Sequence, residues 1–224
     1  MRESGLQTER LNFLTDGVYA IAITLLVLEL KVPEHLPPQA VLPALRDNGP
    51  KFIAYLIAFS ACAIGWTFTY LTHGLVRRGG PAHLMCTLVS LLAVGLIPFS
   101  SALMGNYPDS SWGIVAYAAD VGLLAAVYAL DLMLASRRLP SHVDRRPVRV
   151  LYMSALGVAG VAVVSGGWLA FVSPRLCLYV IGAVTATIWI EYAFLVGWIG
   201  RAISALEDAG HTHRPTRPER RRRA

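Results

Sequence analysis

The sequence predicts an all-α membrane protein with six transmembrane helices per subunit. Hydrophobic residues make up 55% of the 224 residues and charged residues only 15%, and the mean hydropathy is +0.52. A soluble domain cannot hide this much apolar surface in one core. Six apolar stretches are long enough to cross a bilayer, whose hydrocarbon core of about 30 Å needs about 20 helical residues. The basic residues gather on one side of these stretches, as they do in multi-pass proteins.

The six predicted spans follow one another through short connections. The longest connection, residues 33–51, begins with Pro33, holds four further prolines and leaves no room for a soluble domain. The third span is interrupted by Pro98, and the fifth holds four glycines, which is typical of close helix packing. The spans comprise residues 13–32, 52–71, 84–103, 112–134, 148–172 and 176–199.

The distribution of Lys and Arg predicts the orientation. Sixteen of these residues fall on the side of both termini and four on the opposite side. Because basic residues resist translocation, we expect both termini in the cytoplasm and the chain in the cell inner (plasma) membrane. The first span is not a cleavable signal peptide, since it contains Asp16 and ends without a small-residue cleavage site.

The domain organisation follows from the same composition. Residues 1–209 form one transmembrane domain, and residues 210–224 form a disordered basic tail on the cytoplasmic side. The arginines of this tail favour binding to anionic lipid, at about 1 kcal/mol for each arginine near the surface. We expect no nucleic-acid partner, no cofactor and no fixed metal ion.

Four acidic residues inside the predicted spans are candidates for function, because a charge at mid-span costs about 2.5 to 3.5 kcal/mol unless it is paired or hydrated. They are Asp16, Asp120, Asp131 and Glu191. Asp131 lies six residues before Arg137 and seven before Arg138, so we expect an ion pair near a helix end. Asp120 and Glu191 lie deeper. Each of them either bonds to a neighbouring helix or lines water, and the sequence leaves both alternatives open.

Asp16 opens the first predicted span, six residues after Arg10. A helix places these two side chains about 120° apart, so they bind different neighbours. One interpretation is that Thr15 and Asp16 cap the start of a helix. The other is that Arg10 and Asp16 organise the structure around the cytoplasmic end of the span.

A stripe of small, hydroxyl and aliphatic side chains follows Asp16 along the first span. Its members recur at helical spacing and therefore share one face. Such a stripe suits the close approach of several copies of this helix around an axis, although stripes of this kind also pack within one subunit. The stripe consists of Gly17, Ile21, Thr24 and Leu28, with Leu25 beside it.

These residues resemble a known family. The segment from Arg10 to Asp16, with the apolar helix after it, is similar to the R-x-x-x-F-S-D signature and first helix of the potassium channels related to animal lysosomal transmembrane protein 175. The resemblance continues in Trp66, in residues 96–103 and in Tyr107. Leu14 and Thr15 stand where the family has Phe and Ser, and a histidine pair usually follows the tryptophan where this chain has Thr69 and Tyr70.

The resemblance implies a function and a set of site residues. In this family the first helices of the assembled subunits line the pore, and bulky aliphatic side chains form its narrowest ring. Carried over by position, Ile21 is the main constriction, Leu25 and Leu28 lie further along, Gly17 belongs to the same lining, and Thr24 supplies hydroxyls to a transient potassium ion. The signature residues, Arg10, Leu14, Thr15, Asp16 and Trp66, then form a structural network.

The implied protein is a potassium-permeable homotetramer, because single-repeat members of the family resemble tetramers and this chain has no evident repeat. Like the family, it lacks a TVGYG-like P-loop filter. An alternative class is a proton-coupled secondary transporter that uses Asp120 and Glu191. An enzyme ranks last, since the six histidines are scattered.

Overall fold

The computed structural model describes residues 3–75, 80–137, 146–183, 185–186 and 189. The chain divides into two units, residues 1–187 and 188–224, and only residue 189 of the second is described. The helices described here all belong to the first unit. Glu191 and the basic tail at residues 210–224 lie outside the described residues, so the predictions about them remain predictions.

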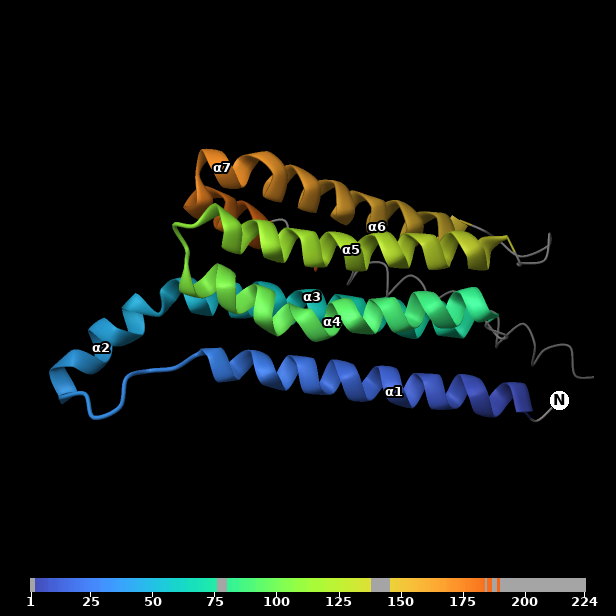
Figure 1. The fold of residues 1–224 in the computed structure, drawn as a ribbon, viewed down its shortest axis with the longest axis horizontal. Coiled ribbons are helices and arrows are strands. Elements are labelled where there is room, and N and C mark those ends of the chain that lie inside the picture. Colours follow the sequence, from blue (N-terminus) through green and yellow to red (C-terminus); the bar gives the residue numbers. More distant parts are fainter. Residues whose placement is uncertain (1–2, 76–79, 138–145, 184, 187–188, 190–224) are drawn as a thin grey trace, which may run out of the picture. The chain divides into compact units, whose positions relative to one another are not determined.

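The regular secondary structure in the described part of the chain is all helical, with no strand (Figure 1). Two short non-α segments, a 3-10 turn η1 and a π-helical turn η2, extend or interrupt the α-helices. The elements are α1 (Glu3–Leu26), η1 (Val27–Glu29), α2 (Pro38–Asp47), α3 (Gly49–Leu75), α4 (Pro81–Asn106), α5 (Ser111–Ser136), α6 (Arg146–Val164), η2 (Ser165–Leu169), α7 (Ala170–Val172) and a further helix, Pro174–Ala183.

Five segments of the described residues are long and apolar enough to cross a membrane, and they match the first five predicted spans. They are Glu9–Glu29, Gly49–Tyr70, Pro81–Asn106, Ser111–Leu134 and Tyr152–Val172. The sixth predicted span begins in the helix Pro174–Ala183, but most of its remainder lies outside the described residues. The all-helical membrane fold is therefore confirmed, and the sixth span stays a prediction.

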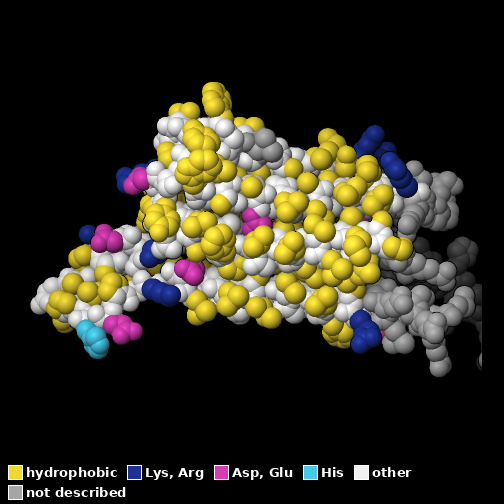
Figure 2. Space-filling view, in the orientation of Figure 1, with side chains coloured by type: hydrophobic (Ala, Val, Ile, Leu, Met, Phe, Trp, Pro, Cys, Tyr) yellow, Lys and Arg dark blue, Asp and Glu magenta, His cyan; other side chains and the backbone are white. Residues whose placement is uncertain are grey.

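Helix α4 is central in the first unit, where it contacts α1, α3 and α5, while α5 in turn contacts α6 (Figure 1). Small buried side chains, such as Ala58 and Cys62 of α3 and Ala93 of α4, allow the helices to approach closely. At Gly166 the backbone of η2 comes so near α5 that an added Cβ would lie 2.6 Å from the Cβ of Ala118. The face shown in Figure 2 is largely apolar between its ends, and the Lys and Arg side chains seen on it lie toward the ends.

Two features of the structure differ from the sequence predictions. Helix α1 already begins at Glu3, so Asp16 lies in the middle of a helix and cannot cap its start. The connection between the first two spans contains the amphipathic helix α2, which the prolines had hidden. Pro38 stands at its first position, where its missing N–H is not needed, and Pro43 lies inside it.

Candidate pore-lining surface

Helix α1 has one buried face and one free face. Tyr19, Ala22 and Leu26 are 1–2% exposed and pack against the bundle. On the other side, Ile21 is 60% exposed, Leu25 43% and Leu28 59%. Gly17 and Thr24 are exposed as well, and an added Cβ at Gly17 would meet nothing within 4 Å. We call this exposed set, Gly17, Ile21, Thr24, Leu25 and Leu28, the α1 free face.

The Thr24 hydroxyl has a defined orientation on this face. Its Oγ1 lies 3.0 Å from the carbonyl oxygen of Ala20 and 2.9 Å from that of Ile21, and it donates to these backbone acceptors. A hydroxyl has one proton and two lone pairs, so its acceptor side remains available. An exposed Thr24 can therefore present oxygen, rather than hydrogen, to a cation.

Asp16 is held from the neighbouring helix. The indole Nε1 of Trp66 in α3 donates to Asp16 Oδ1 at 2.8 Å, and Tyr70 stacks on Trp66 with ring centroids 6.1 Å apart. A hydrogen bond to a carboxylate is stronger than one between neutral groups. The contact ties α1 to α3 close to the start of the α1 free face.

The other signature residues lie around this contact. Thr15 is buried, and its hydroxyl donates to the carbonyl oxygen of Leu11 at 2.9 Å. Leu14 and Arg10 are exposed. Within the described residues, Arg10 forms no ion pair with Asp16.

A buried cluster of hydroxyl groups joins three helices behind the α1 free face. The hydroxyls of Tyr19 and Tyr128 are hydrogen-bonded to each other, and Thr69 Oγ1 lies 3.1 Å from the Tyr128 hydroxyl. Tyr128 also donates to the carbonyl oxygen of Gly65 at 3.2 Å. An added Cβ at Gly65 would lie 2.8 Å from the Tyr19 hydroxyl, so only glycine fits there without a shift. We call Tyr19, Gly65, Thr69 and Tyr128 the tyrosine cluster.

The tyrosine cluster was not predicted from the sequence, in which Thr69 stood out only as a departure from the histidine pair of the family. The cluster joins residues that lie 59 and 109 positions apart in the chain, and no local spacing reveals such a meeting. The signal that could have pointed to it is the presence of tyrosine hydroxyls inside apolar spans, because a buried hydroxyl needs a partner.

A second polar cluster lies about one helical turn from the tyrosine cluster on α3 and α5, and it also includes α4. His83 Nδ1 of α4 bonds Asp131 Oδ1 of α5 at 2.7 Å, and both residues are 7% exposed. His73 of α3 meets Asn12 of α1 at 2.5 Å and lies edge-on to His83, with ring centroids 5.1 Å apart. Asp131 is therefore bonded to His83 in place of the expected ion pair with Arg137, while Arg138 lies outside the described residues.

Asp120 lies inside the bundle between α4 and α5. Ser100 Oγ of α4 lies 2.8 Å from Asp120 Oδ2, whereas Oδ1 is buried without a hydrogen-bond partner in the described residues. Asp120 therefore bonds to a neighbouring helix, which is one of the two alternatives that the sequence left open. It is 8% exposed and does not belong to the α1 free face.

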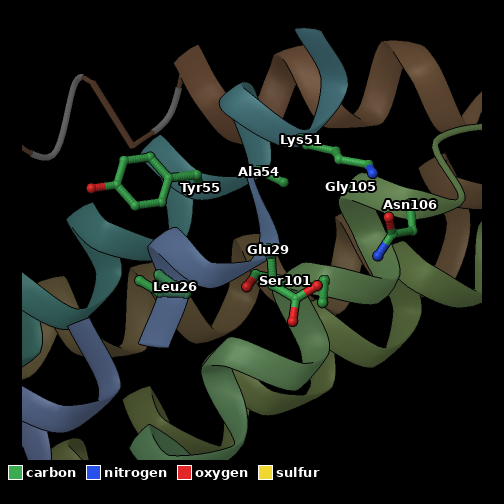
Figure 3. A pocket seen from close by; sticks show the side chains of 9 residues that line it. Leu26, Glu29, Lys51, Ala54, Tyr55, Ser101, Gly105 and Asn106 are labelled. Atoms are coloured by element: carbon green, nitrogen blue, oxygen red, sulfur yellow. The ribbon is translucent and has the colours of Figure 1, made fainter. Parts of the chain in front are cut away.

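A pocket opens where η1 meets the first turns of α3 and the end of α4 (Figure 3). Leu26 and Glu29 line it from the first span, Lys51 from α3, and Ser101 and Asn106 from α4. Glu29 thus lines a pocket of mixed polar and apolar side chains. The neighbouring Leu28 remains on the exposed side.

Comparison with known proteins gives relatives named as potassium channels and as proton channels. Residues 10–98 match the family described as endosomal/lysosomal potassium channel TMEM175. A potassium channel of Chamaesiphon minutus is 33% identical over 54% of this chain and 61% of that protein, and one of Streptomyces collinus is 35% identical over 48% and 50%. The human endosomal/lysosomal proton channel TMEM175 is 27% identical over 57% of this chain and 27% of that protein.

The fold has a solved counterpart as well. The crystal structure of a lysosomal potassium-selective channel TMEM175 homologue from Chamaesiphon minutus superposes with a TM-score of 0.74. It is 27% identical to this chain and covers 83% of it, and this chain covers 97% of that structure.

The helices and their apolar surface define a multi-pass membrane protein. The resemblance to the TMEM175 family is confirmed, by sequence over residues 10–98 and by fold over most of the chain. That family is described as an ion channel. The aligned segments span about half to three fifths of the two bacterial relatives.

Proposed function

We propose that the chain is a subunit of a potassium-permeable cation channel whose pore is lined by the α1 free face. The observation that carries the proposal is the division of α1 into a buried and an exposed side. Ile21, Leu25 and Leu28 stay exposed although their helix packs on two others. Several copies that turn this face toward a common axis would cover it. The bacterial relatives named potassium channels support the choice of ion.

The proposed assembly is a homotetramer of six-helix subunits without a P-loop filter. A ring of Ile21 side chains cannot coordinate a cation, so it gates by excluding water, and conduction requires the ring to widen or to hydrate. Thr24 hydroxyls supply oxygen ligands to a partly dehydrated potassium ion. Because a ring of hydroxyls is a weaker ligand set than stacked carbonyls, the preference for potassium over sodium is modest.

The proposed placement is the cell inner membrane with both termini in the cytoplasm. It rests on the asymmetric distribution of basic residues, 16 on the terminal side and four on the other. The α1 segment that carries Arg10 then forms the cytoplasmic entrance. Leu28 and Glu29 lie toward the outer end.

The decisive experiment measures potassium flux from purified protein in liposomes, with sodium as the comparison. Replacing Ile21→Ala removes the bulk of the constriction, so potassium leak should rise several-fold. The matched control is Leu92→Ala, which trims a 63% exposed leucine of α4 away from the α1 free face and should leave flux unchanged. An equal potassium flux in wild type and Ile21→Ala would contradict the assignment of Ile21 to the pore constriction.

The rival proposal, a proton-coupled transporter, retains one specific observation, the unpaired Oδ1 of buried Asp120. Transport of that kind would require a proton gradient and would stop in Asp120→Asn. A channel conducts potassium down its own gradient with no pH difference across the membrane. The same liposomes, prepared with equal pH on both sides, separate the two classes.

A further inference from the structure

A pocket of about 230 Å³ lies where the ends of three membrane-length segments meet (Figure 3). Glu29 is the last residue of the first segment, Lys51 lies near the start of the second, and Asn106 is the last residue of the third. Because such a segment ends where the hydrocarbon layer ends, the pocket lies at the depth of the lipid headgroups. No residue of the α1 free face lines it.

The pocket holds one acid and one base that do not pair with each other. Glu29 lines it from η1 and Lys51 from α3, and both are partly buried. Neither side chain forms an ion pair among the residues that the structure describes, and Figure 3 shows the Lys51 ammonium apart from the Glu29 carboxylate. A ligand with one positive and one negative group complements both charges, whereas an ion of a single sign leaves one of them without a partner.

An apolar strip of α3 continues from the pocket toward the middle of the membrane. Tyr55 lines the pocket, and its ring meets that of Phe59, one turn deeper, with centroids 6.1 Å apart. Phe52, Leu56 and Phe59 recur at helical spacing and are 45%, 58% and 37% exposed. We call these three residues the α3 apolar strip. A charged pocket at headgroup depth beside an apolar strip favours an amphiphile over a water-soluble zwitterion.

The size and the hydrogen-bonding groups of the pocket narrow the headgroup. Pockets for drug-sized ligands measure about 300–1,000 Å³, so this smaller one suits a compact group. Ser101 donates to the carbonyl oxygen of Pro98 at 3.0 Å, which leaves lone pairs on its hydroxyl oxygen as acceptors. A primary ammonium has three N–H donors for Ser101 and Glu29, whereas a trimethylammonium has none. The Asn106 amide can donate to a phosphate beside Lys51.

We infer that this pocket binds a membrane phospholipid whose headgroup carries a primary ammonium and a phosphate, as in phosphatidylethanolamine. The ammonium bonds Glu29 and Ser101, the phosphate bonds Lys51 and Asn106, and an acyl chain lies along the α3 apolar strip. The bound lipid joins the end of the first span to α3 and α4. This site does not depend on the proposed pore, because no residue of the α1 free face takes part.

The test measures lipid binding to the full-length protein by native mass spectrometry from mixed micelles. The probes are dioleoyl phosphatidylethanolamine, phosphatidylcholine and phosphatidylglycerol. We expect phosphatidylethanolamine to bind about tenfold tighter than either other lipid, since phosphatidylcholine lacks the N–H donors and phosphatidylglycerol lacks the positive charge. Free phosphoethanolamine, which lacks the acyl chains, should bind more weakly still. Phosphatidylethanolamine binding no tighter than either competing lipid would overturn the inference.

Variants locate the site within the chain. Glu29→Gln and Lys51→Gln each remove one charge and should weaken binding of phosphatidylethanolamine about tenfold. Glu29→Gln leaves only the positive charge, so its preference should move toward phosphatidylglycerol. The controls are Glu34→Gln and Arg46→Gln, which neutralise exposed side chains outside the pocket and should bind as wild type does.

A second readout needs no variant. The melting temperature of the wild-type protein should rise by about 3–6 °C with saturating phosphatidylethanolamine and stay constant with phosphatidylcholine. An equal rise with both lipids, or wild-type binding in both Glu29→Gln and Lys51→Gln, would contradict the assigned site, whatever the flux assay shows.

Discussion

At the scale of single residues, the Asp16 and Trp66 contact is the first that a mutation can test. Asp16→Ala removes a charge-assisted hydrogen bond from an exposed site, and we expect a loss of about 1–2 kcal/mol in unfolding free energy. Trp66→Phe removes the same bond from the other side. The measurement is denaturation of both single variants and of the double variant, together with the fraction of assembled protein.

Non-additive losses would show that the two side chains act on each other. If the losses simply add, Asp16 holds α1 through some other contact. Asp16→Asn is the control, because its amide keeps an acceptor for the indole N–H. This variant should assemble better than Asp16→Ala.

The packing of Gly65 in the tyrosine cluster can be tested with a destabilising variant and a second substitution that restores stability. A methyl group at this position would lie 2.8 Å from the Tyr19 hydroxyl and 3.2 Å from the Tyr128 hydroxyl. We expect Gly65→Ala to destabilise the protein by about 1–3 kcal/mol, since overpacking displaces side chains. Adding Tyr19→Phe removes the nearest atom and should restore part of this loss in thermal denaturation. A double variant less stable than both single variants would contradict the geometry.

Asp120 tests whether an acid inside the bundle has a transport role. Ser100 donates from Oγ to Asp120 Oδ2 at 2.8 Å and also lies 3.2 Å from the carbonyl oxygen of Ile97, whereas Oδ1 is buried without a partner among the described residues. Asp120→Asn keeps the shape and an oxygen acceptor for the Ser100 hydroxyl, so potassium flux should stay within about twofold of wild type. Ser100→Ala is the companion variant. A flux abolished in Asp120→Asn would favour proton coupling instead.

At the scale of elements, the sequence predicted the spans well because membrane-length apolar runs are a strong and local signal. Five of the six predicted spans correspond to helices, with ends that differ by a few residues. Helix α2 was missed because its prolines were read as breakers, although Pro38 occupies a position where proline is favoured. The capping interpretation of Asp16 was wrong because α1 starts about three turns before the apolar run, so Asp16 does not lie at the start of the helix.

The candidate site was predictable only in part. The α1 free face could be drawn from helical spacing, since a stripe depends on one element alone. Whether this face of α1 is exposed or buried depends on how α3 and α4 pack on α1, and helical spacing within one element does not reveal that packing. The partner of Asp131 shows the same limit. The arginines nearest in sequence are close along the chain, but the acid points inward toward His83.

In the fifth span, a π-helical turn lies where the helix packs closely against α5. Its four glycines suggested one close-packing surface, but Gly157, Gly160 and Gly167 have no neighbour within 4 Å of an added Cβ among the described residues. Gly166 alone is closely packed. It lies in the π-helical turn η2, which widens the helix where it meets Ala118 of α5.

At the scale of the whole molecule, the basic residues of the chain predict a lipid dependence. Residues 210–224 contain six arginines and one glutamate. Near an anionic bilayer each arginine contributes about 1 kcal/mol, and salt screens this attraction. Removing residues 210–224 should weaken binding of the protein to anionic nanodiscs at low salt, with little change on neutral lipid. The control replaces these arginines with lysine, which keeps the charge; equal binding with and without the segment would remove the proposed role.

The tetramer can be tested through the α1 free face itself. Cys62, Cys86 and Cys177 are all buried, so a cysteine introduced at an exposed position is the accessible thiol among the described residues. If α1 helices surround a common axis, Ile21→Cys should form disulfide-linked dimers on mild oxidation, because its copies face one another across the pore. Leu92→Cys, on an exposed part of α4, should stay monomeric on the same gel. Native mass spectrometry should give the mass of four 24.3 kDa chains. A monomeric mass, or cross-linking at Leu92→Cys in place of Ile21→Cys, would place the subunit interface elsewhere and leave the α1 free face toward lipid.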